Sequence, residues 1–324
     1  MLQSIVKHRY WWFAISLLVI VPGAIALGLW GLRTGIDFAG GALWDIRFTE
    51  REASQLNTER IRDIFAAQGF DGAQVQLTEE QTADGRTVPA TLVRTKALST
   101  TNPEQEQAKV LEALRAEYGA VERESLQSVG ATVSNESTRS AVLAVLGACV
   151  AILIYLTMAF RRAPHPLRYG VCAILAMVHD VLVVIGVAAI LGELIGLEVD
   201  ALFLTALLTV ISFSVHDTIV VFDRIRENLV NRRPGESFED IVNHSVVQTL
   251  PRSINTQLTT LFTLVALLLF GGETIRNLVL ILLIGLISGT YSSIFNAAQL
   301  LVVWENREWR RWFRRSADEP APAA

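Results

Sequence analysis

The sequence predicts a polytopic α-helical membrane protein, with six transmembrane helices and one α+β domain between the first two helices. Two observations carry this prediction. Hydrophobic residues make up 51% of the 324 residues and charged residues only 19%, a balance too apolar for an ordinary soluble domain. The apolar residues also gather in runs of about 20, the length of helix that crosses a hydrocarbon core.

Six such runs divide the chain. Five contain no charged side chain or only an isolated polar pair, and one, which begins just after Arg252, is slightly shorter. In chain order the runs are residues 11–30, 141–160, 171–191, 201–222, 253–270 and 278–304. The first run is long for a signal peptide, and the following sequence LWGLRTGIDFAGG has no small-residue cleavage pattern. We therefore expect it to be a retained membrane anchor.

Lysine and arginine are concentrated in alternate connections between the runs, which predicts the orientation of the chain in the membrane. The basic residues of these connections are Lys7, Arg9, Arg161, Arg162, Arg168, Arg224, Arg226, Arg232, Arg233, Arg307, Arg310, Arg311, Arg314 and Arg315. The short connections on the other side hold one basic residue, Arg276. Both termini are therefore expected in the cytoplasm.

This orientation predicts four parts of the chain. They are a cytoplasmic N-terminus with transmembrane helix 1 (1–31), an extracytoplasmic domain (32–137), transmembrane helices 2–6 (138–304) and a cytoplasmic tail (305–324). Residues 32–137 contain 11 Lys and Arg against 17 Asp and Glu. A net negative charge argues against a domain that binds nucleic acid or an anionic membrane surface.

The extracytoplasmic domain shows a regular succession of strand and helix patterns. Strands are expected near 42–49, 73–78, 88–95 and 121–129, and helices near 57–67 and 103–117. Asp84 and Gly85 predict a tight turn between the two middle strands, and Asn102 before Pro103 predicts a helix start. The order β-α-β-β-α-β is that of a ferredoxin-like domain, and nothing in it resembles a catalytic site.

A few polar residues interrupt the transmembrane runs. A charged side chain at the centre of a membrane costs about 2.5–3.5 kcal/mol on insertion scales, so such residues are functional candidates by default. His179 and Asp180 lie near the centre of the third run, and His216 and Asp217 near the cytoplasmic end of the fourth. Arg252 opens the fifth run from the cytoplasmic side, so we expect Asp217 and Arg252 at similar depth.

Three runs also carry polar stripes, because their polar residues recur every three or four positions and share one helix face. The stripes are Thr205, Thr209, Ser212 and His216 in the fourth run, Arg252, Thr256, Thr259 and Thr263 in the fifth, and Ser288, Ser292, Asn296 and Gln299 in the sixth. One interpretation is hydrogen bonding that holds the helices together, worth about 0.6 kcal/mol per bond. The other interpretation is a polar path across the membrane. An acid and a base at matching depth favour this second interpretation.

Asp217 and Arg252 are the main candidates for proton transport. Burial favours a neutral carboxyl group and a nearby guanidinium favours the ionised form, so an acid held between these effects can load and release a proton as helices move. The alternative is a permanent ion pair that only fixes helix packing. His179, Asp180 and His216 are second-rank candidates, since a histidine in a bundle is as easily a neutral hydrogen-bonding residue as a proton relay.

Several separated segments resemble the SecF branch of the SecD/SecF family, from about residue 5 to residue 305. They are GIDFAGG at 35–41, VHD at 178–180, VHDTIVVFDRIRE at 215–227, RSINTQLTT at 252–260 and SGTYSSIFNA at 288–297. The three glycines of the first motif would allow either a hinge or a tight turn, and we expect the turn, followed by the start of a strand. The motif residues of the first and third segments are Asp37, Phe38, Gly40, Gly41, Asp223 and Arg224.

The resemblance implies a fold and a set of roles. The family belongs to the resistance-nodulation-division superfamily, whose twelve spans form two pseudo-symmetric halves, so this chain would be one half and SecD the other. Asp217 would be the intramembrane acid and Arg252 its basic partner, with Thr256 and Thr259 beside them. Three residues differ from those common in the family: His216 in place of Asn, Ser253 in place of Thr, and Gln257 in place of Ser.

The resemblance also implies an activity. Such a complex uses the proton motive force to promote the late stage of translocation of secreted polypeptides across the bacterial cytoplasmic membrane. The expected partners are SecD, the SecYEG channel, SecA, the unfolded exported polypeptide and membrane lipid. A proton gradient takes the place of a cofactor, and neither a metal ion nor an enzymatic activity is expected.

Other functions remain open at this point. One is a structural subunit that stabilises a translocon without moving protons, and another is a small-molecule exporter of the same superfamily, although its large paired extracytoplasmic domains are missing. A third possible function is that of an intramembrane aspartic protease, with Asp180 and Asp217 as its catalytic pair. The chain lacks the Tyr-Asp and Gly-x-Gly-Asp contexts of that protease class, and Arg252 would compete for the second acid. It also lacks a His-Glu-x-x-His motif and a phosphate-binding glycine loop.

Overall fold

The computed structural model describes residues 5–50, 52–81 and 87–308. Two compact units make up the chain. The smaller unit is Thr34–Val142, and the larger one combines Met1–Arg33 with Leu143–Ala324.

The smaller unit is built on a sheet of four antiparallel strands in the order β2-β3-β1-β4. The strands are β1 Gly41–Phe48, β2 Gln74–Gln81, β3 Thr87–Thr95 and β4 Val121–Val129, and the helices of this unit are α2 Ile36–Ala39, the 3-10 turn Ala53–Gln55, α3 Thr58–Ala67 and α4 Pro103–Tyr118. Each predicted strand and helix is present within a few residues. The predicted turn at Asp84 and Gly85 lies outside the described residues.

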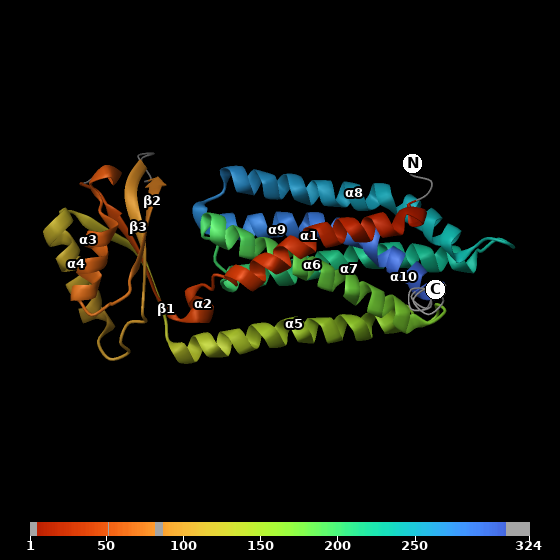
Figure 1. The fold of residues 1–324 in the computed structure, drawn as a ribbon, viewed down its shortest axis with the longest axis horizontal. Coiled ribbons are helices and arrows are strands. Elements are labelled where there is room, and N and C mark those ends of the chain that lie inside the picture. Colours follow the sequence, from red (N-terminus) through yellow and green to blue (C-terminus); the bar gives the residue numbers. More distant parts are fainter. Residues whose placement is uncertain (1–4, 51, 82–86, 309–324) are drawn as a thin grey trace, which may run out of the picture. The chain divides into compact units, whose positions relative to one another are not determined.

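Both α3 and α4 cover the same face of the sheet and enclose a hydrophobic core with it (Figure 1). On β1, Trp44, Ile46 and Phe48 alternate with more exposed residues and point into this core, as period-two patterning requires. Trp44 satisfies its indole N–H by donating to Thr95 Oγ1 at 3.0 Å. Helix α4 begins after Asn102 as predicted, but the Asn102 side chain makes no capping hydrogen bond.

The motif GIDFAGG forms one turn of helix, α2, followed directly by the start of β1. Gly40 has φ of 74° and Gly41 has φ of 118°, a region that favours glycine. A Cβ at Gly41 would lie 2.6 Å from the carbonyl oxygen of Thr95 on the neighbouring strand. The glycines therefore allow the chain to turn tightly into the sheet.

The larger unit is a bundle of long helices, with part of α5 also belonging to the smaller unit. Its elements are the 3-10 turn Val6–His8, α1 Arg9–Trp30, α5 Ala131–Ala159, α6 Pro166–Ile195, α7 Ala201–Val230, α8 Phe238–Phe270, α9 Glu273–Ser292, a π-helical turn at Ser293–Ala297 and α10 Ala298–Glu305. Within the described ranges, six helices are long and apolar enough to cross a membrane, and α9, the π turn and α10 together form the sixth.

Two helices extend well beyond the predicted apolar runs at one end of the bundle. Helix α7 continues to Val230, and α8 begins at Phe238, where Ser237 caps it by accepting a hydrogen bond from the backbone N–H of Asp240. The helix then runs through Pro251 without ending. The fifth run therefore does not begin a new helix at residue 253, because a polar amphipathic segment precedes it in the same helix.

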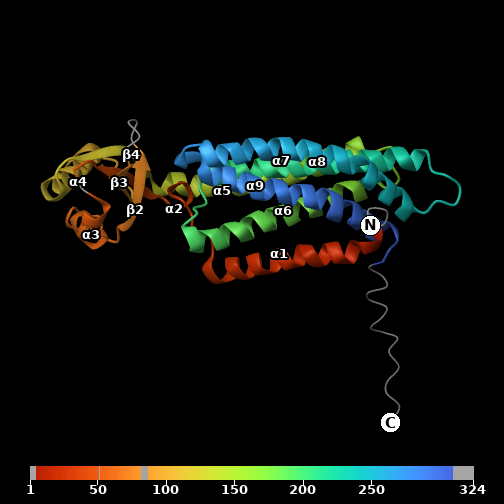
Figure 2. The same ribbon diagram turned by 90° about the horizontal axis from the view of Figure 1, so that it is seen from above.

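Close contact between helices depends on small residues. Helix α1 packs against α6 (Figure 2) at Gly23 and Gly186, where a Cβ on Gly23 would lie 2.8 Å from the Cα of Gly186. Helix α9 packs against α6, α7 and α8, and a Cβ on Gly289 would lie 3.2 Å from the Cβ of Ser214 on α7. This close approach of α9 places its polar residues against the centre of the bundle.

Candidate functional site

Asp180 lies in the middle of α6 and is completely buried. Its Oδ2 accepts hydrogen bonds from Ser214 Oγ of α7 at 2.5 Å and from Ser292 Oγ of α9 at 2.6 Å. Its Oδ1 accepts a third from Ser288 Oγ of α9 at 2.7 Å. Three hydroxyl groups from two helices thus replace the water that a buried carboxylate has lost.

His179 adds a fourth contact, because its Nδ1 lies 3.0 Å from Asp180 Oδ1. The other ring nitrogen, Nε2, is buried and has no hydrogen-bond partner among the described residues. The ring lies 6.0 Å from that of Tyr291, whose hydroxyl donates to the carbonyl oxygen of Trp12 on α1 at 2.5 Å. We call Asp180, His179, Ser214, Ser288 and Ser292 the Asp180 cluster.

Asp217 lies about one turn beyond Ser214 on the same buried side of α7. It is almost fully buried, and its Oδ2 accepts a hydrogen bond from the side-chain amide of Gln257 on α8. Asp180 and Asp217 therefore occupy neighbouring places in the bundle, and each accepts hydrogen bonds from side chains of other helices.

Arg252 does not pair with Asp217, contrary to the expectation from the sequence. Its side chain is exposed, and no ion pair joins it to an acid within the part of the chain that the structure describes. The reason is helical geometry: Arg252 and Gln257 are five positions apart on α8, which separates their directions by about 140°. Because Gln257 faces Asp217, Arg252 faces away from it.

The polar stripes of α7 and α8 also face outward. Thr256 and Thr259 are exposed and donate to carbonyl oxygens of their own helix, at 2.9 Å and 2.7 Å. His216 is exposed as well, together with Thr205 and Ser212. These residues are thus not brought to the Asp180 cluster, and they leave two neighbouring helices with polar faces open to the outside of this chain.

The stripe of the sixth run faces inward. Ser288 and Ser292 bind Asp180, and Asn296 donates to Ser16 of α1 at 2.9 Å. Gln299 is fully buried, and neither amide atom has a partner among the described residues. Of the three predicted stripes, this one contributes to the interior of the bundle.

The remaining motif residues lie outside the bundle centre. Asp223 and Arg224 are near the end of α7, where Asp223 accepts from Arg226 at 2.7 Å and Arg224 donates to Glu227 at 2.6 Å. Both pairs join residues three positions apart on one helix, so they support α7 locally. Asp37 lies in the first turn of α2, and Phe38 follows it in the same turn.

Ser214 is the residue that reasoning from the sequence missed. The polar stripe predicted for the fourth run contains His216, and Ser214 does not belong to that helix face. A signal was present, since Ser214 lies three positions before Asp217 and four after Val210, which is also buried. Among the described residues, no group of three or more His, Cys, Asp or Glu could hold a metal ion.

The fold and this site define a multi-pass membrane protein whose helix bundle buries the carboxyl groups of Asp180 and Asp217. Residues 109–307 match the family described as "Protein export membrane protein SecD/SecF, C-terminal". The protein translocase subunit SecF of Thermobaculum terrenum is 51% identical over 320 residues, which cover 98% of this chain and 99% of that protein. SecF of Anaerolinea thermophila is 47% identical over 322 residues, covering 99% of both. The chain belongs to the SecF branch of the SecD/SecF family.

Solved structures agree with this assignment. The crystal structure of SecDF from Thermus thermophilus, described as a translocon-associated membrane protein, has a TM-score of 0.76 and 33% identity, and covers 93% of this chain and 38% of that chain. The protein translocase subunit SecDF of Bacillus subtilis is 36% identical, over 94% of this chain and 38% of that protein. The chain thus spans well under half of either SecDF protein. The names of these relatives support a role in protein export rather than in catalysis.

Proposed function

We propose that the chain pairs with SecD and uses the proton motive force to promote the late stage of translocation of unfolded secretory polypeptides. In this proposal it works with the SecYEG channel and SecA in the bacterial cytoplasmic membrane. Asp217 carries the proton. The observation that supports this most directly is a nearly fully buried acid in the middle of α7, next to polar helix faces that the chain itself does not cover.

Pairing with SecD is supported by the fused relatives. Both SecDF proteins contain a region like this chain within a much longer chain. The remaining part of each longer chain is long enough to hold a partner half. Thr205, Ser212, His216 and the exposed side of α8 would then meet the partner instead of lipid. Arg252, Thr256 and Thr259 remain proposed proton-transport residues, and they would act from this shared face.

The orientation and the domain class belong to the same proposal. The basic connections favour an orientation with both termini in the cytoplasm and the sheet domain outside. The β-α-β-β-α-β element order and the sheet order β2-β3-β1-β4 support a ferredoxin-like class for that domain. One charge that crosses the membrane supplies about 2.3 kcal/mol per 100 mV, enough to bias two conformations that differ by a few kcal/mol.

The test is secretion-coupled ion flux in inverted vesicles that contain this chain with its SecD partner. Asp217→Asn keeps the size and hydrogen bonding of the side chain but cannot carry a proton. We expect it to abolish both ion flux and the stimulation of export while the complex still assembles. Asp200→Asn is the matched control, because Asp200 caps the start of α7 and Asn caps equally well.

Normal flux and export in Asp217→Asn would show that Asp217 has a structural role. The subunit would then stabilise the translocon without moving protons itself, or the partner half would carry them. Loss of assembly together with flux would likewise point to packing, because a proton carrier is needed for transport but not for association.

A further inference from the structure

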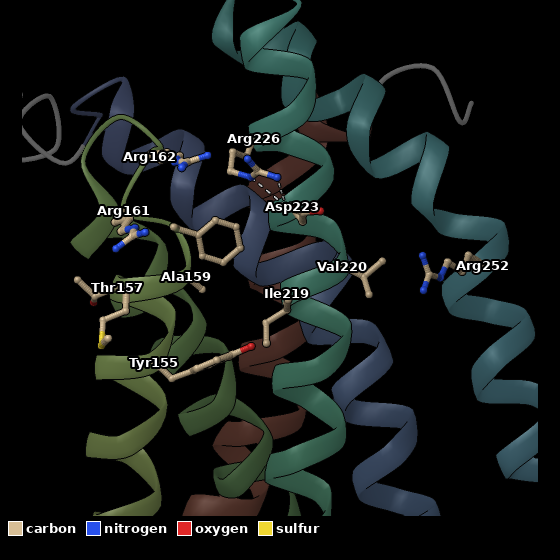
Figure 3. A pocket seen from close by; sticks show the side chains of 12 residues that line it. Tyr155, Thr157, Ala159, Arg161, Arg162, Ile219, Val220, Asp223, Arg226 and Arg252 are labelled. Atoms are coloured by element: carbon tan, nitrogen blue, oxygen red, sulfur yellow. Dashed lines mark hydrogen bonds and ion pairs between the residues drawn. The ribbon is translucent and has the colours of Figure 1, made fainter.

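A row of buried polar residues runs along α8 inside the bundle. Its members recur every four positions and are Ser245, Thr249, Ser253 and Gln257. Arg252 precedes Ser253 in the chain but does not belong to this row. It is exposed and lines a hollow on the outer side of α7 and α8, where Figure 3 shows it with Val220. We call the four buried residues the inner row.

The inner row leads from Asp217 to the end of the bundle where α7 connects to α8, which we call the α7/α8 end. Gln257 donates to Asp217 Oδ2, and at the other end of the row Asn228 of α7 donates to Ser245 Oγ at 2.8 Å. Helix α8 therefore runs antiparallel to α7. Asn228 is half-buried, so the row extends from a buried acid to the edge of the bundle.

Ser253 differs from the other hydroxyl residues of the inner row. Ser245 and Thr249 donate to carbonyl oxygens of their own helix, at 2.7 Å and 3.0 Å. Ser253 Oγ and Gln257 Oε1 are buried without a hydrogen-bond partner among the described residues. Such atoms are rare in folded proteins, because each has lost its hydrogen bonds to water, so they indicate a further polar group beside them.

Gln299 of α10 adds two more unpaired polar atoms. Its side chain is completely buried, and neither Oε1 nor Nε2 has a partner within the part of the chain that the structure describes. Helix α10 packs against α8, α7 and α6. The amide of Gln299 is thus enclosed by the helices that carry the inner row and Asp217.

The depth of Gln299 follows from the packing of α9 on α7. These helices run in the same direction, as two successive close contacts show, Gly285 with Val210 and Gly289 with Ser214. At a rise of about 1.5 Å per residue, Gln299 lies about 10 Å beyond Asp217 toward the α7/α8 end. On the antiparallel helix α8, Ser253 lies about 6 Å and Thr249 about 12 Å beyond Gln257 in that direction. Gln299 is therefore level with the middle of the inner row.

The chemistry of Gln299 decides what can satisfy these atoms. Its amide presents an unpaired acceptor, Oε1, and an unpaired donor, Nε2. A cation would bind the acceptor but would be repelled by the N–H groups of the donor, whereas water can donate to the first and accept from the second. We infer that Ser253, Gln257 and Gln299 hold ordered water inside the bundle, and that this water connects Asp217 with the α7/α8 end through this chain alone.

The water site stands on the unpaired atoms, but its role in transport rests on the proposed function, in which Asp217 carries the proton. The neutral carboxyl group of Asp217 passes its proton to the first water molecule, which passes one of its own to the next. The last water molecule releases a proton at the α7/α8 end. Each water keeps the number of protons with which it began, so no charge remains in the bundle. Ser253 and Gln299 are thus positioning residues that hold the water.

The first test measures access of a small ion to the inner row. Silver ions react with cysteine thiolates that they reach through hydrated passages, and the reaction blocks later maleimide labelling. Ser253→Cys and Val246→Cys are compared in a chain that carries Cys149→Ala and Cys172→Ala, assembled with its SecD partner in inverted vesicles. Val246 is completely buried on the same helix but lies outside the inner row. We expect Ser253→Cys to react about tenfold faster or more. Equal rates would show that the inner row is dry.

A second measurement asks whether the amide of Gln299 is satisfied. In a dry interior, Gln299→Met would remove two unpaired polar atoms and raise the unfolding temperature of the purified chain. If water is bound there, the same substitution removes partners of that water, and we expect a lower unfolding temperature. The effects of Gln299→Met and Ser253→Ala should also be non-additive, because both residues bind the same water. Leu301→Met, at a buried apolar residue of α10, is the control and should change the temperature less. An unchanged or raised temperature in Gln299→Met would refute the water site.

Secretion-coupled ion flux separates this inference from the proposed function. We expect Ser253→Ala to reduce the flux about tenfold, and Ser253→Thr, which keeps the hydroxyl group, to recover most of the loss. If Asp217→Asn abolishes flux and Ser253→Ala does not reduce it, the proposed function stands and the path along the inner row is wrong. If Asp217→Asn leaves the flux unchanged while Ser253→Cys still reacts rapidly with silver, the water site stands and the proposed function fails.

Discussion

Ser214 donates a hydrogen bond of 2.5 Å to Asp180 and lies three residues before Asp217 on α7. The buried acids Asp180 and Asp217 are therefore connected through about one turn of a single helix. Any movement of α7 that shifts Asp217 also shifts Ser214, the hydrogen-bond donor to Asp180. The Asp180 cluster thus links the position of the proposed proton carrier to α6 and α9.

Asp180→Ala should be strongly destabilising. It removes the acceptor of three buried hydroxyl groups, and only that of Ser292 keeps another acceptor, the carbonyl oxygen of Gly289 at 3.2 Å. We therefore expect the free energy of unfolding to decrease by about 3–5 kcal/mol. The measurement is unfolding of the purified chain in detergent. Glu193→Ala is the control, because its ion pair with Arg33 is exposed and should contribute less than about 1 kcal/mol. Equal effects of the two substitutions would contradict a special role of the cluster.

Gln257→Leu should affect both stability and transport. It removes the amide group that donates to Asp217, which should lower the free energy of unfolding by about 1–3 kcal/mol and reduce secretion-coupled ion flux. Gln248→Leu makes the same chemical change on the same helix, at a residue whose hydrogen bonds are to exposed groups. If both variants transport ions like the native chain, Gln257 does not assist Asp217.

Gly23→Ala should weaken the contact between α1 and α6. The new methyl group would lie 2.8 Å from the Cα of Gly186, so the two helices must move apart. We expect a lower thermal unfolding temperature and a decrease of about 1–3 kcal/mol in stability. Gly28→Ala on the same helix has no atom within 4 Å of the added methyl group and should change stability little. In the same unfolding experiment, Gly23→Ala should therefore have a lower unfolding temperature than Gly28→Ala.

The lowered pKa of Glu308 should make the stability of the protein depend on pH. Burial raises the pKa of this carboxyl group, but hydrogen bonds from Arg9, Tyr10 and Asn306 outweigh that effect and hold the pKa below its ordinary value. A lowered folded pKa stabilises the protein fully above the unfolded value of about 4.3, and the contribution is lost as pH falls through the folded pKa.

The measurement is the unfolding temperature of native chain and Glu308→Gln between neutral pH and pH about 3. The native chain should be more stable than the variant at neutral pH, and the difference should shrink on acidification. Glu193→Gln, which alters an exposed pair with Arg33, should change the unfolding temperature much less than Glu308→Gln at neutral pH. If the difference in unfolding temperature between the native chain and Glu308→Gln stays constant with pH, the pKa of Glu308 is not lowered in the folded protein.

Patterns of hydrophobicity predicted the elements of this protein well. Apolar runs revealed the six long helices, and alternation over residues such as Trp44, Ile46 and Phe48 revealed the strands, because burial on one face imposes the period of the secondary structure on the sequence. The ends of the helices were less predictable. Helix α8 extends through Pro251, since packing and capping rather than hydropathy decide where a helix begins.

By itself, the sequence determined the class of the protein, the number of spans and the identity of the polar residues within them, because the cost of burying charge in a membrane makes these residues rare and visible. Only the tertiary structure decided which of them meet. It directed Gln257 rather than Arg252 toward Asp217 and made Asp180 the centre of three hydroxyl groups. The direction of a side chain around its helix depends on contacts with other helices, and residues 34 to 112 positions apart in the chain supply them.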